Sequence, residues 1–344
     1  MTMATDTHPD RTGTNVRAVV QHRYGSADVL EVGRIARPAI GPDQVLVEVV
    51  AAGLDRGVWH LMTGLPYLVR LMGYGLRRPR QPVPGFDVAG RVVEVGAAVT
   101  RFSPGDEVLG IADGSFAELA AADEAKLVHK PASVGFEEAA VATISGITAL
   151  QALTEVGRLE PGHRVLVIGA SGGVGSFAVQ LAVALGATVT GVAGPAKQDF
   201  VRSLGAVEVV DHTRQQIAEL GRRFDLVIDT GGRNRLRHLR RVLAPTGTLV
   251  IVGGEGGGRF TGGFGRQLRA ALWSLVLPQR MPLFVSAEDR RFIEPLAGYL
   301  ADGSVRSAIG QRFELDEVPD AIRRMEAGEL RGKAAIRVAA QERP

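Results

Sequence analysis

The stretch VLVIGASGGVG, residues 165–175, constrains the fold of this chain more than any other feature. Its first four residues are apolar, as expected of a buried strand, and the residues from 174 onward repeat apolar side chains at helical spacing. The apolar stripe consists of Val174, Phe177, Ala178, Leu181, Ala182 and Leu185. A second strand-like stretch, ATVTGVAG, follows at residues 187–194. This succession of strand, helix and strand predicts a parallel, doubly wound sheet.

The glycines of this stretch lie between the predicted strand and the N-terminus of the predicted helix, where free N–H groups and the helix dipole favour an anion. Gly169 permits a tight turn, Gly172 lets the backbone approach a pyrophosphate, and Gly175 lets the helix pack closely on the strand. The spacing predicts a dinucleotide-binding loop, and the alternative is a tight turn without a ligand. The predicted contacts are Ser171, Gly172, Gly173, Val174 and Gly175.

The end of the second strand indicates which dinucleotide is bound. An NAD site usually offers a carboxylate there, whereas this chain has Val-Ala-Gly-Pro at 192–195. Lys197, one of only four lysines, follows and suits a 2′-phosphate. We therefore predict NADP(H) rather than NAD(H), with His212 as a weaker second phosphate neighbour. The alternative for Lys197 is a solvated side chain at a helix start.

The rest of the chain changes character near residue 137. Before this point, short stretches such as QVLVEVVAAG are separated by glycine, proline and aspartate, which is typical of β-strands and turns. After it, strands alternate with helices, beginning with an apolar helical pattern at 136–157. The predicted fold class is therefore α/β, with an all-β domain beside the parallel sheet.

Composition excludes several classes of protein. The 344 residues carry a formal charge of only +3, which does not suggest a nucleic-acid partner. No apolar run approaches the roughly 20 residues that cross a bilayer, so we expect a cytoplasmic protein without an integral membrane segment. There is no cysteine, which excludes thiolate-bound zinc, iron–sulfur clusters and a cysteine nucleophile.

Six motifs spread over residues 16–340 belong together: QVLVEVVAAGLD, PGFDVAGRVVEVG, FSPGDEV, ASGGVG, LAPTGTLVIVGG and ELRGKAAIRV. In these motifs the chain resembles the medium-chain dehydrogenase/reductase superfamily, and within it the zinc-free quinone oxidoreductase branch. The resemblance implies a GroES-like β-barrel domain made of residues 16–136 and 304–344, and a Rossmann domain made of residues 137–303. Residues 1–15 are expected to be a flexible tail.

The resemblance also bears on the metal. Zinc-dependent members of the superfamily carry a cysteine where Asp55 or Leu54 stands and a histidine in the motif that ends here in Phe86-Asp87. Phe86 has no ligand atom, so we predict no metal site. The alternative is an oxygen- and nitrogen-ligated site of Asp55, Asp87 and His60.

Without a metal, the resemblance implies that NADPH delivers hydride to a quinone or to an α,β-unsaturated carbonyl. Thr148 matches a threonine beside the nicotinamide; the alternative is a helix hydroxyl bonded to its own backbone. Tyr67 falls near a pocket tyrosine that can donate to an oxyanion; the alternative is loop packing. Asp55 stands where quinone-reducing relatives often have asparagine, and is expected to orient Arg56 or a ribose.

Three further cofactor contacts follow from the resemblance. Gly253 and Gly254 are expected under the nicotinamide ribose, and Lys333 either reaches the cofactor or simply flanks a strand. Two alternative functions remain open at this point. One is a zinc-independent NADP-dependent alcohol dehydrogenase or ketone reductase, and the other is a non-catalytic protein that binds or senses NADPH.

Two long apolar and arginine-rich loops, residues 66–84 and 259–284, are predicted to wall the pocket of an apolar carbonyl or quinone substrate. The second contains Leu268, Ala271, Leu272 and Leu275, a pattern that also permits peripheral contact with a membrane. The apolar stretch TLVIVGG at the sheet edge suggests a homodimer.

Overall fold

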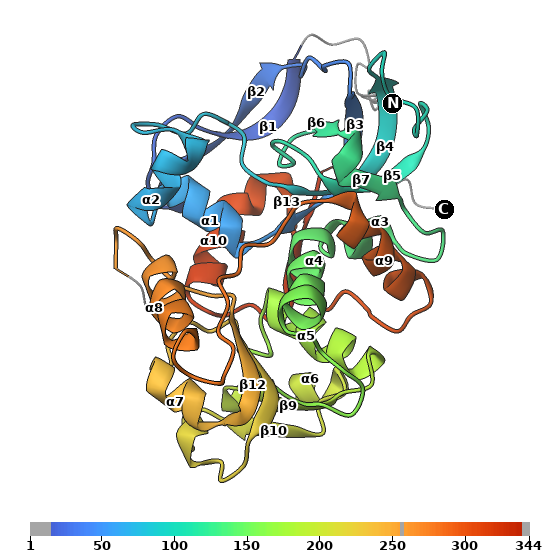
Figure 1. The fold of residues 1–344 in the computed structure, drawn as a ribbon. Helices are drawn as coiled ribbons and strands as arrows, with labels where there is room; N and C mark the ends of the chain where they lie inside the picture. The colour runs from blue at the N-terminus through green and yellow to red at the C-terminus, as the bar shows by residue number, and fades with distance from the viewer. Residues whose placement is uncertain (1–14, 255–257, 339–344) are drawn as a thin grey trace, which may run out of the picture.

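The computed structural model describes residues 15–254 and 258–338, which form a β-rich upper part and a lower part of helices around a sheet (Figure 1). The predicted tail lies outside the described residues except for Asn15, which begins β1 (Asn15–Gln21). The first strand pairs antiparallel with β2 (Leu30–Ala36) in a small sheet of its own.

The lower part contains the predicted parallel sheet, with five strands in the order β10-β9-β8-β11-β12. These strands are β8 (Arg164–Ile168), β9 (Thr188–Ala193), β10 (Glu208–Asp211), β11 (Phe224–Asp229) and β12 (Leu243–Ile251). Alternate side chains of β8 enter different cores: Val165 and Val167 pack in one, Leu166 and Ile168 in the other. Both faces of the sheet are therefore covered, which explains the continuous apolar runs in its strands.

Helices cover these two faces. The first face carries α4 (Thr143–Gln151), α5 (Gly173–Ala184) and α9 (Arg290–Ala301), and the second carries α7 (Leu236–Arg241) and α8 (Phe264–Ser274). The short α6 (Gln198–Ser203) connects β9 to β10. The sheet with helices on both sides confirms the predicted doubly wound architecture.

The upper part is built from both ends of the chain. Its seven-stranded sheet has the order β13-β14-β3-β4-β5-β7, with β6 paired to β3. Five strands come from the first half of the chain, β3 (Gln44–Leu54), β4 (Asp87–Val95), β5 (Glu107–Ile111), β6 (Leu119–Asp123) and β7 (Leu127–His129), and two from its end, β13 (Ile309–Glu314) and β14 (Lys333–Arg337). This GroES-like sheet beside the Rossmann-like sheet confirms the predicted fold class.

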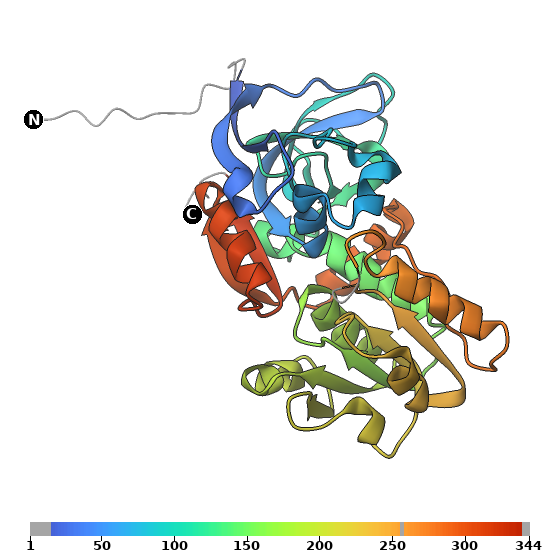
Figure 2. The same ribbon diagram turned by 90° about the vertical axis from the view of Figure 1, so that its left-hand side faces the viewer.

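Three more helices flank the upper sheet: α1 (Arg56–Thr63), α2 (Tyr67–Val69) and α10 (Val318–Glu326). In the view of Figure 2, α10 lies on the opposite side of the molecule from α8. No helix in residues 15–254 and 258–338 is long and apolar enough to cross a membrane.

The helical pattern at 136–157 is interrupted instead of forming one helix, and its last turn, Ala152–Val156, is π-helical. The first helix, α3 (Phe136–Ala140), ends before α4 begins at Thr143. The Asp87 carboxylate of the upper part accepts a hydrogen bond from the Ile144 N–H at 2.7 Å, in the first turn of α4. Tertiary contacts of this kind override helical periodicity, and they fix α4 at the junction of the two parts.

Candidate functional site

The glycine turn between β8 and α5 has the geometry that its spacing predicts. Gly169 has φ of 79°, a left-handed conformation that glycine adopts without strain. A side-chain carbon at Gly175 would lie 2.1 Å from the Gly169 carbonyl oxygen, so only glycine fits where the helix passes the strand. Gly172 caps α5 with extended backbone, and its N–H donates to Gly169 O at 3.0 Å. The turn thus presents the N-terminus of a 12-residue helix to a ligand.

The residues predicted to select a 2′-phosphate lie beyond the ends of β9 and β10. The His212 imidazole lies against Gly194, whose side-chain position would be 3.5 Å from His212 Nε2. Lys197 Nζ donates to the carbonyl oxygens of Gly328 at 2.8 Å and Leu330 at 2.7 Å. Burial, assisted by the positive charge of Arg331, lowers the pKa of Lys197. Two neutral carbonyl acceptors therefore hold this lysine at the sheet edge.

A buried polar cluster joins the two parts of the molecule beside the glycine turn. Lys333 Nζ, at the start of β14, donates to Asp55 Oδ1 at 2.5 Å and to Ser145 Oγ at 3.1 Å, and lies 3.4 Å from Asp87 Oδ2. Ser145 also donates to Asp55 Oδ1 at 2.8 Å. None of these four side chains is more than 7% exposed. We call Asp55, Asp87, Ser145 and Lys333 the lysine cluster.

The lysine cluster touches the glycine turn directly. A side-chain carbon at Gly173 would lie 3.1 Å from Ser145 Oγ and 3.2 Å from Lys333 Cδ. In addition, the Gly332 N–H donates to the Ser171 carbonyl at 2.9 Å. Lys333 therefore lies at the start of β14 and packs against the glycine turn.

Burial and charge set the protonation of the cluster. Burial raises the pKa of Asp55, but the Lys333 charge and hydrogen bonds outweigh it and hold this pKa below its ordinary value. Burial and the negative charge of Asp55 raise the pKa of Asp87 well above its ordinary value. Burial lowers the pKa of Lys333, but the two acidic neighbours raise it above its ordinary value. Of the two carboxyl groups, Asp55 therefore ionises more readily and Asp87 holds its proton more strongly.

The structure also locates the residues predicted near the nicotinamide. The Thr148 hydroxyl donates to Ile144 O at 2.6 Å, the backbone bond of the alternative interpretation. Gly253 passes tightly against β11, since a side-chain carbon there would lie 1.9 Å from Thr230 O. Gly254 packs in the same way against Gly263, at the start of α8. Close approach of the backbone thus requires glycine at both positions.

The two long loops meet each other. The Tyr67 N–H donates to Arg259 O at 2.7 Å, the Leu68 N–H donates to Phe260 O at 3.1 Å, and the Tyr67 and Phe260 rings form an edge contact with centroids 5.5 Å apart. Figure 1 shows α2 above α8 on the left-hand side of the molecule. A cavity of about 100 Å³, lined largely by apolar residues that include Tyr74, Val83 and Phe86, lies beside the first loop.

The residues of the alternative metal site do not assemble. Lys333 Nζ lies between Asp55 and Asp87, and His60 Nδ1 is 2.8 Å from the Leu65 carbonyl. Across the part of the chain that the structure describes, no three histidine, aspartate or glutamate side chains converge as a metal site requires.

Sequence reasoning did not find Ser145 and did not connect Asp87 with Lys333. Residues 87, 145 and 333 are far apart in the sequence, and no local spacing relates them. One signal was available, because Lys333 is one of four lysines and stands directly before the apolar residues Ala334, Ala335 and Ile336.

Known proteins resemble this chain over most of its length. Residues 41–132 match the alcohol dehydrogenase GroES-like domain, and residues 204–336 match the zinc-binding dehydrogenase family. A quinone oxidoreductase of Pseudomonas aeruginosa is 32% identical over 91% of this chain and 97% of its own length. A 2-methylene-furan-3-one reductase of Solanum lycopersicum is 32% identical over 91% of this chain and 76% of its own. A mycobacterial protein solved in complex with NADPH is 25% identical, with a TM-score of 0.80 over 94% of this chain and 100% of its own.

Fold, glycine turn and relatives together define an oxidoreductase of the medium-chain dehydrogenase/reductase type that uses a nicotinamide cofactor and acts on a small molecule. Within that superfamily, the chain belongs to the quinone oxidoreductase-like branch.

Proposed function

We propose that this protein is an NADPH-dependent oxidoreductase that transfers hydride to a quinone or an α,β-unsaturated carbonyl without a metal ion. The observation that carries the proposal is the Lys333 ammonium between Asp55 and Asp87, because the carboxyls that could hold a metal are paired with a lysine instead. Conjugated acceptors suit such a site, since delocalisation spreads the charge that arriving hydride creates. The names of the Pseudomonas and tomato relatives support both acceptor classes.

The glycine turn fits the pyrophosphate of a nicotinamide dinucleotide. Gly172, Gly173 and Val174 begin α5, where the first backbone N–H groups of a helix have no partner within the helix. Ser171 and Gly175 hold this helix start against β14 and β8. When bound, the nicotinamide supplies the hydride, and Gly253 and Gly254 provide a surface without side chains for its ribose.

The preference for NADPH rests on the end of β9. No carboxylate stands at Ala193 or Gly194, where an NAD site usually offers one. Lys197 and His212 lie at the same edge, and Lys197 would exchange two neutral carbonyl acceptors for a phosphate dianion. A charge-assisted contact of this kind contributes about 1.5 to 3 kcal/mol. The mycobacterial neighbour with bound NADPH supports the same preference.

We assign different roles to Asp55 and Tyr67. Asp55 is ionised because of Lys333, so it cannot donate a proton, and its role is to hold Lys333 and Ser145 in place. Tyr67 stands on the loop that meets Phe260, and its phenol is the donor for the oxyanion of the reduced acceptor. The Thr148 hydroxyl donates its hydrogen bond to Ile144 O, so its oxygen acts toward the nicotinamide as an acceptor.

A homodimer through the edge of the parallel sheet is part of the proposal. Strand β12 is at this edge, and residue 280 forms a parallel bridge with Thr248 beside it. Exposed apolar side chains flank this bridge, among them Val276, Leu283 and Val285. A second copy of the chain, packed against these exposed apolar side chains, would bury them.

The decisive experiment is to mix the protein with NADPH and a panel of quinones and enones while following nicotinamide absorbance, with and without a chelator. We expect turnover that the chelator does not change. Oxidation of simple alcohols with NADP⁺ in preference to these reductions would support the alcohol dehydrogenase alternative, and binding of NADPH without any turnover would contradict the proposal.

A further inference from the structure

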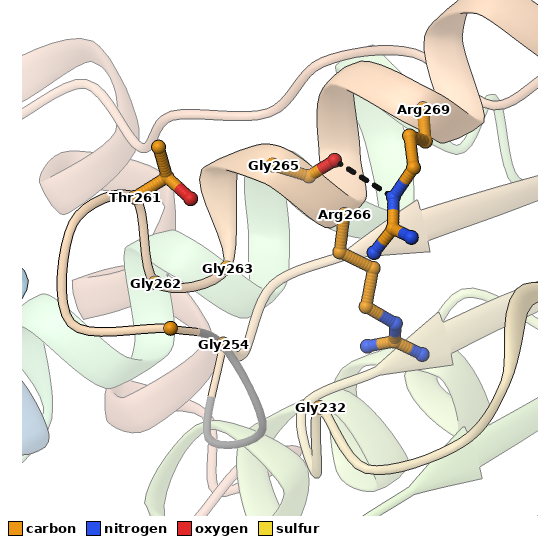
Figure 3. A pocket seen from close by; sticks show the side chains of 9 residues that line it. Gly232, Gly254, Thr261, Gly262, Gly263, Gly265, Arg266 and Arg269 are labelled. Carbon is orange, nitrogen blue, oxygen red and sulfur yellow. Dashed lines mark hydrogen bonds between the residues drawn. The ribbon is translucent and has the colours of Figure 1, made fainter.

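A hollow of about 290 Å³ lies at the start of α8 (Figure 3). Its walls are mostly backbone, because glycines line it at Gly232, Gly254, Gly262, Gly263 and Gly265. The polar side chains around it are Thr261, Arg266 and Arg269. Figure 3 shows the two arginines projecting from the same side of α8, one turn apart.

Arg266 is the unusual member of this set. Arg266 is only 9% exposed. Its Nη2 donates to Asp229 Oδ2 at 2.5 Å and to Asn234 O at 2.6 Å. Its Nη1 is also buried, and it has no hydrogen-bond partner in the described part of the chain. Leaving a charged donor buried and unpaired is costly, and such groups usually have a partner. The hollow that Arg266 lines is where a ligand would provide that partner.

Other donors face the same space. The α8 helix has 11 residues, and the positive end of its dipole lies at the hollow. The N–H groups of Phe264 and Arg266 in its first turn already donate to Thr261 O and Gly263 O, each at 3.0 Å. Arg269 is exposed, and its Nε donates a hydrogen bond to Gly265 O at 3.2 Å. Its Nη groups are therefore available to a ligand. Among the residues that the structure describes, charge favours an anion as well, because two arginines line the hollow and Asp229 is the one carboxylate paired with them.

The hollow lies between the two halves of the proposed active site. Gly254, on one wall, is a predicted contact of the nicotinamide ribose. Gly262, on another wall, lies against Pro66, since a side-chain carbon there would be 2.8 Å from Pro66 Cγ. Pro66 directly precedes Tyr67, the proposed proton donor. An acidic group in the hollow would therefore be near both the cofactor and the acceptor.

We propose that this hollow binds an oxyanion, a carboxylate or phosphate, carried by the acceptor that the enzyme reduces. The inference rests on the proposed function for the identity of the acceptor, but not for the anion site itself. The buried Nη1 of Arg266 and an Nη group of Arg269 donate to the oxyanion, and the positive end of the α8 dipole favours its charge.

Titration of the ligand-free protein with inorganic phosphate, by calorimetry at constant ionic strength against chloride, tests the anion site without any turnover. We expect saturable binding that Arg269→Gln weakens about tenfold, since one charge-assisted contact is lost. Arg266→Lys, which retains a cation beside Asp229 but removes Nη1, also weakens it. Arg241→Gln removes an exposed charge from α7 and serves as the matched control, with no change expected. Absence of saturable binding, or equal loss in the control, overturns the site.

A pair of acceptors that differ only in charge tests the substrate class. We expect the wild type to reduce 4-oxo-2-pentenoate with a higher kcat/KM than its methyl ester, and Arg269→Gln to lower this ratio about tenfold through KM. A ratio that Arg269→Gln leaves unchanged, together with normal phosphate binding, overturns the assignment to the acceptor and shows a site for free anions. If no acceptor is reduced at all, the proposed function fails, and the phosphate titration still decides the anion site.

Discussion

The glycine turn at 169–175 and the lysine cluster touch each other at Gly173, yet they are assembled in different ways. The turn is made of consecutive residues whose conformations follow from helix and strand geometry. The cluster draws its four side chains from β14, α4, β4 and the residue between β3 and α1. The turn can therefore exist wherever one strand and one helix meet, whereas the cluster exists only when both parts of the molecule have docked.

This difference predicts that the cluster is the more sensitive of the two to substitution. In Lys333→Met the ionised Asp55 loses its partner inside the protein, and we expect the free energy of unfolding to fall by about 3 to 5 kcal/mol, because an uncompensated buried charge remains. Urea denaturation measures the loss. The double variant Lys333→Met/Asp55→Asn, in which no buried charge is left, should recover part of it. A loss below about 1 kcal/mol in the single variant would contradict the buried ion pair.

Substitutions in the glycine turn should act through steric clashes and not through the loss of a charge. In Gly175→Ala the new methyl group meets Gly169 O, and we expect a cost of about 1 to 3 kcal/mol, with NADPH binding weakened by about one to two orders of magnitude. Fluorescence titration of NADPH measures the effect. Gly298→Ala on α9 is the matched control, because no atom lies within 4 Å of the added carbon. Equal behaviour of the two variants would mean that the turn is not tightly packed.

The same difference explains what the sequence could reveal. The strand, the helix and the fit of glycine at 169 and 175 follow from periodicity and steric rules that act within about a dozen residues. The contact of Lys333 with Ser145 depends on how the two folded parts meet. Its contact with Asp87 depends on how strands far apart in the sequence come together in the upper sheet, and no local pattern encodes either arrangement. Lys197 illustrates the difference. Its position after β9 could be predicted from the sequence, but its hydrogen bonds to the carbonyls of Gly328 and Leu330 could not.

Lys197 also allows the cofactor preference to be tested. We expect Lys197→Ala to weaken NADPH binding about tenfold or more and to leave NADH binding nearly unchanged, because only NADPH carries the 2′-phosphate. Fluorescence titration with both cofactors measures this, and a thermal melt monitors the loss of the bonds to Gly328 and Leu330. Arg202→Ala, on the exposed side of α6, is the control. Equal losses for both cofactors would show that the phosphate lies elsewhere.

The smallest effect we predict is a change in pH dependence. Between its ordinary pKa, about 4, and its raised pKa, Asp87 keeps its proton only in the folded state, so raising the pH favours unfolding. An asparagine side chain at this position would mimic the protonated acid, and its oxygen can still accept from the Ile144 N–H. In urea denaturation above pH about 4, we expect Asp87→Asn to gain stability over the wild type by up to about 1.4 kcal/mol per pH unit. For the control Asp43→Asn, at an exposed position, we expect a curve of unfolding free energy against pH that is parallel to that of the wild type. Parallel curves for Asp87→Asn as well would mean that Asp87 is ionised in the folded protein and that the lysine cluster carries a net negative charge.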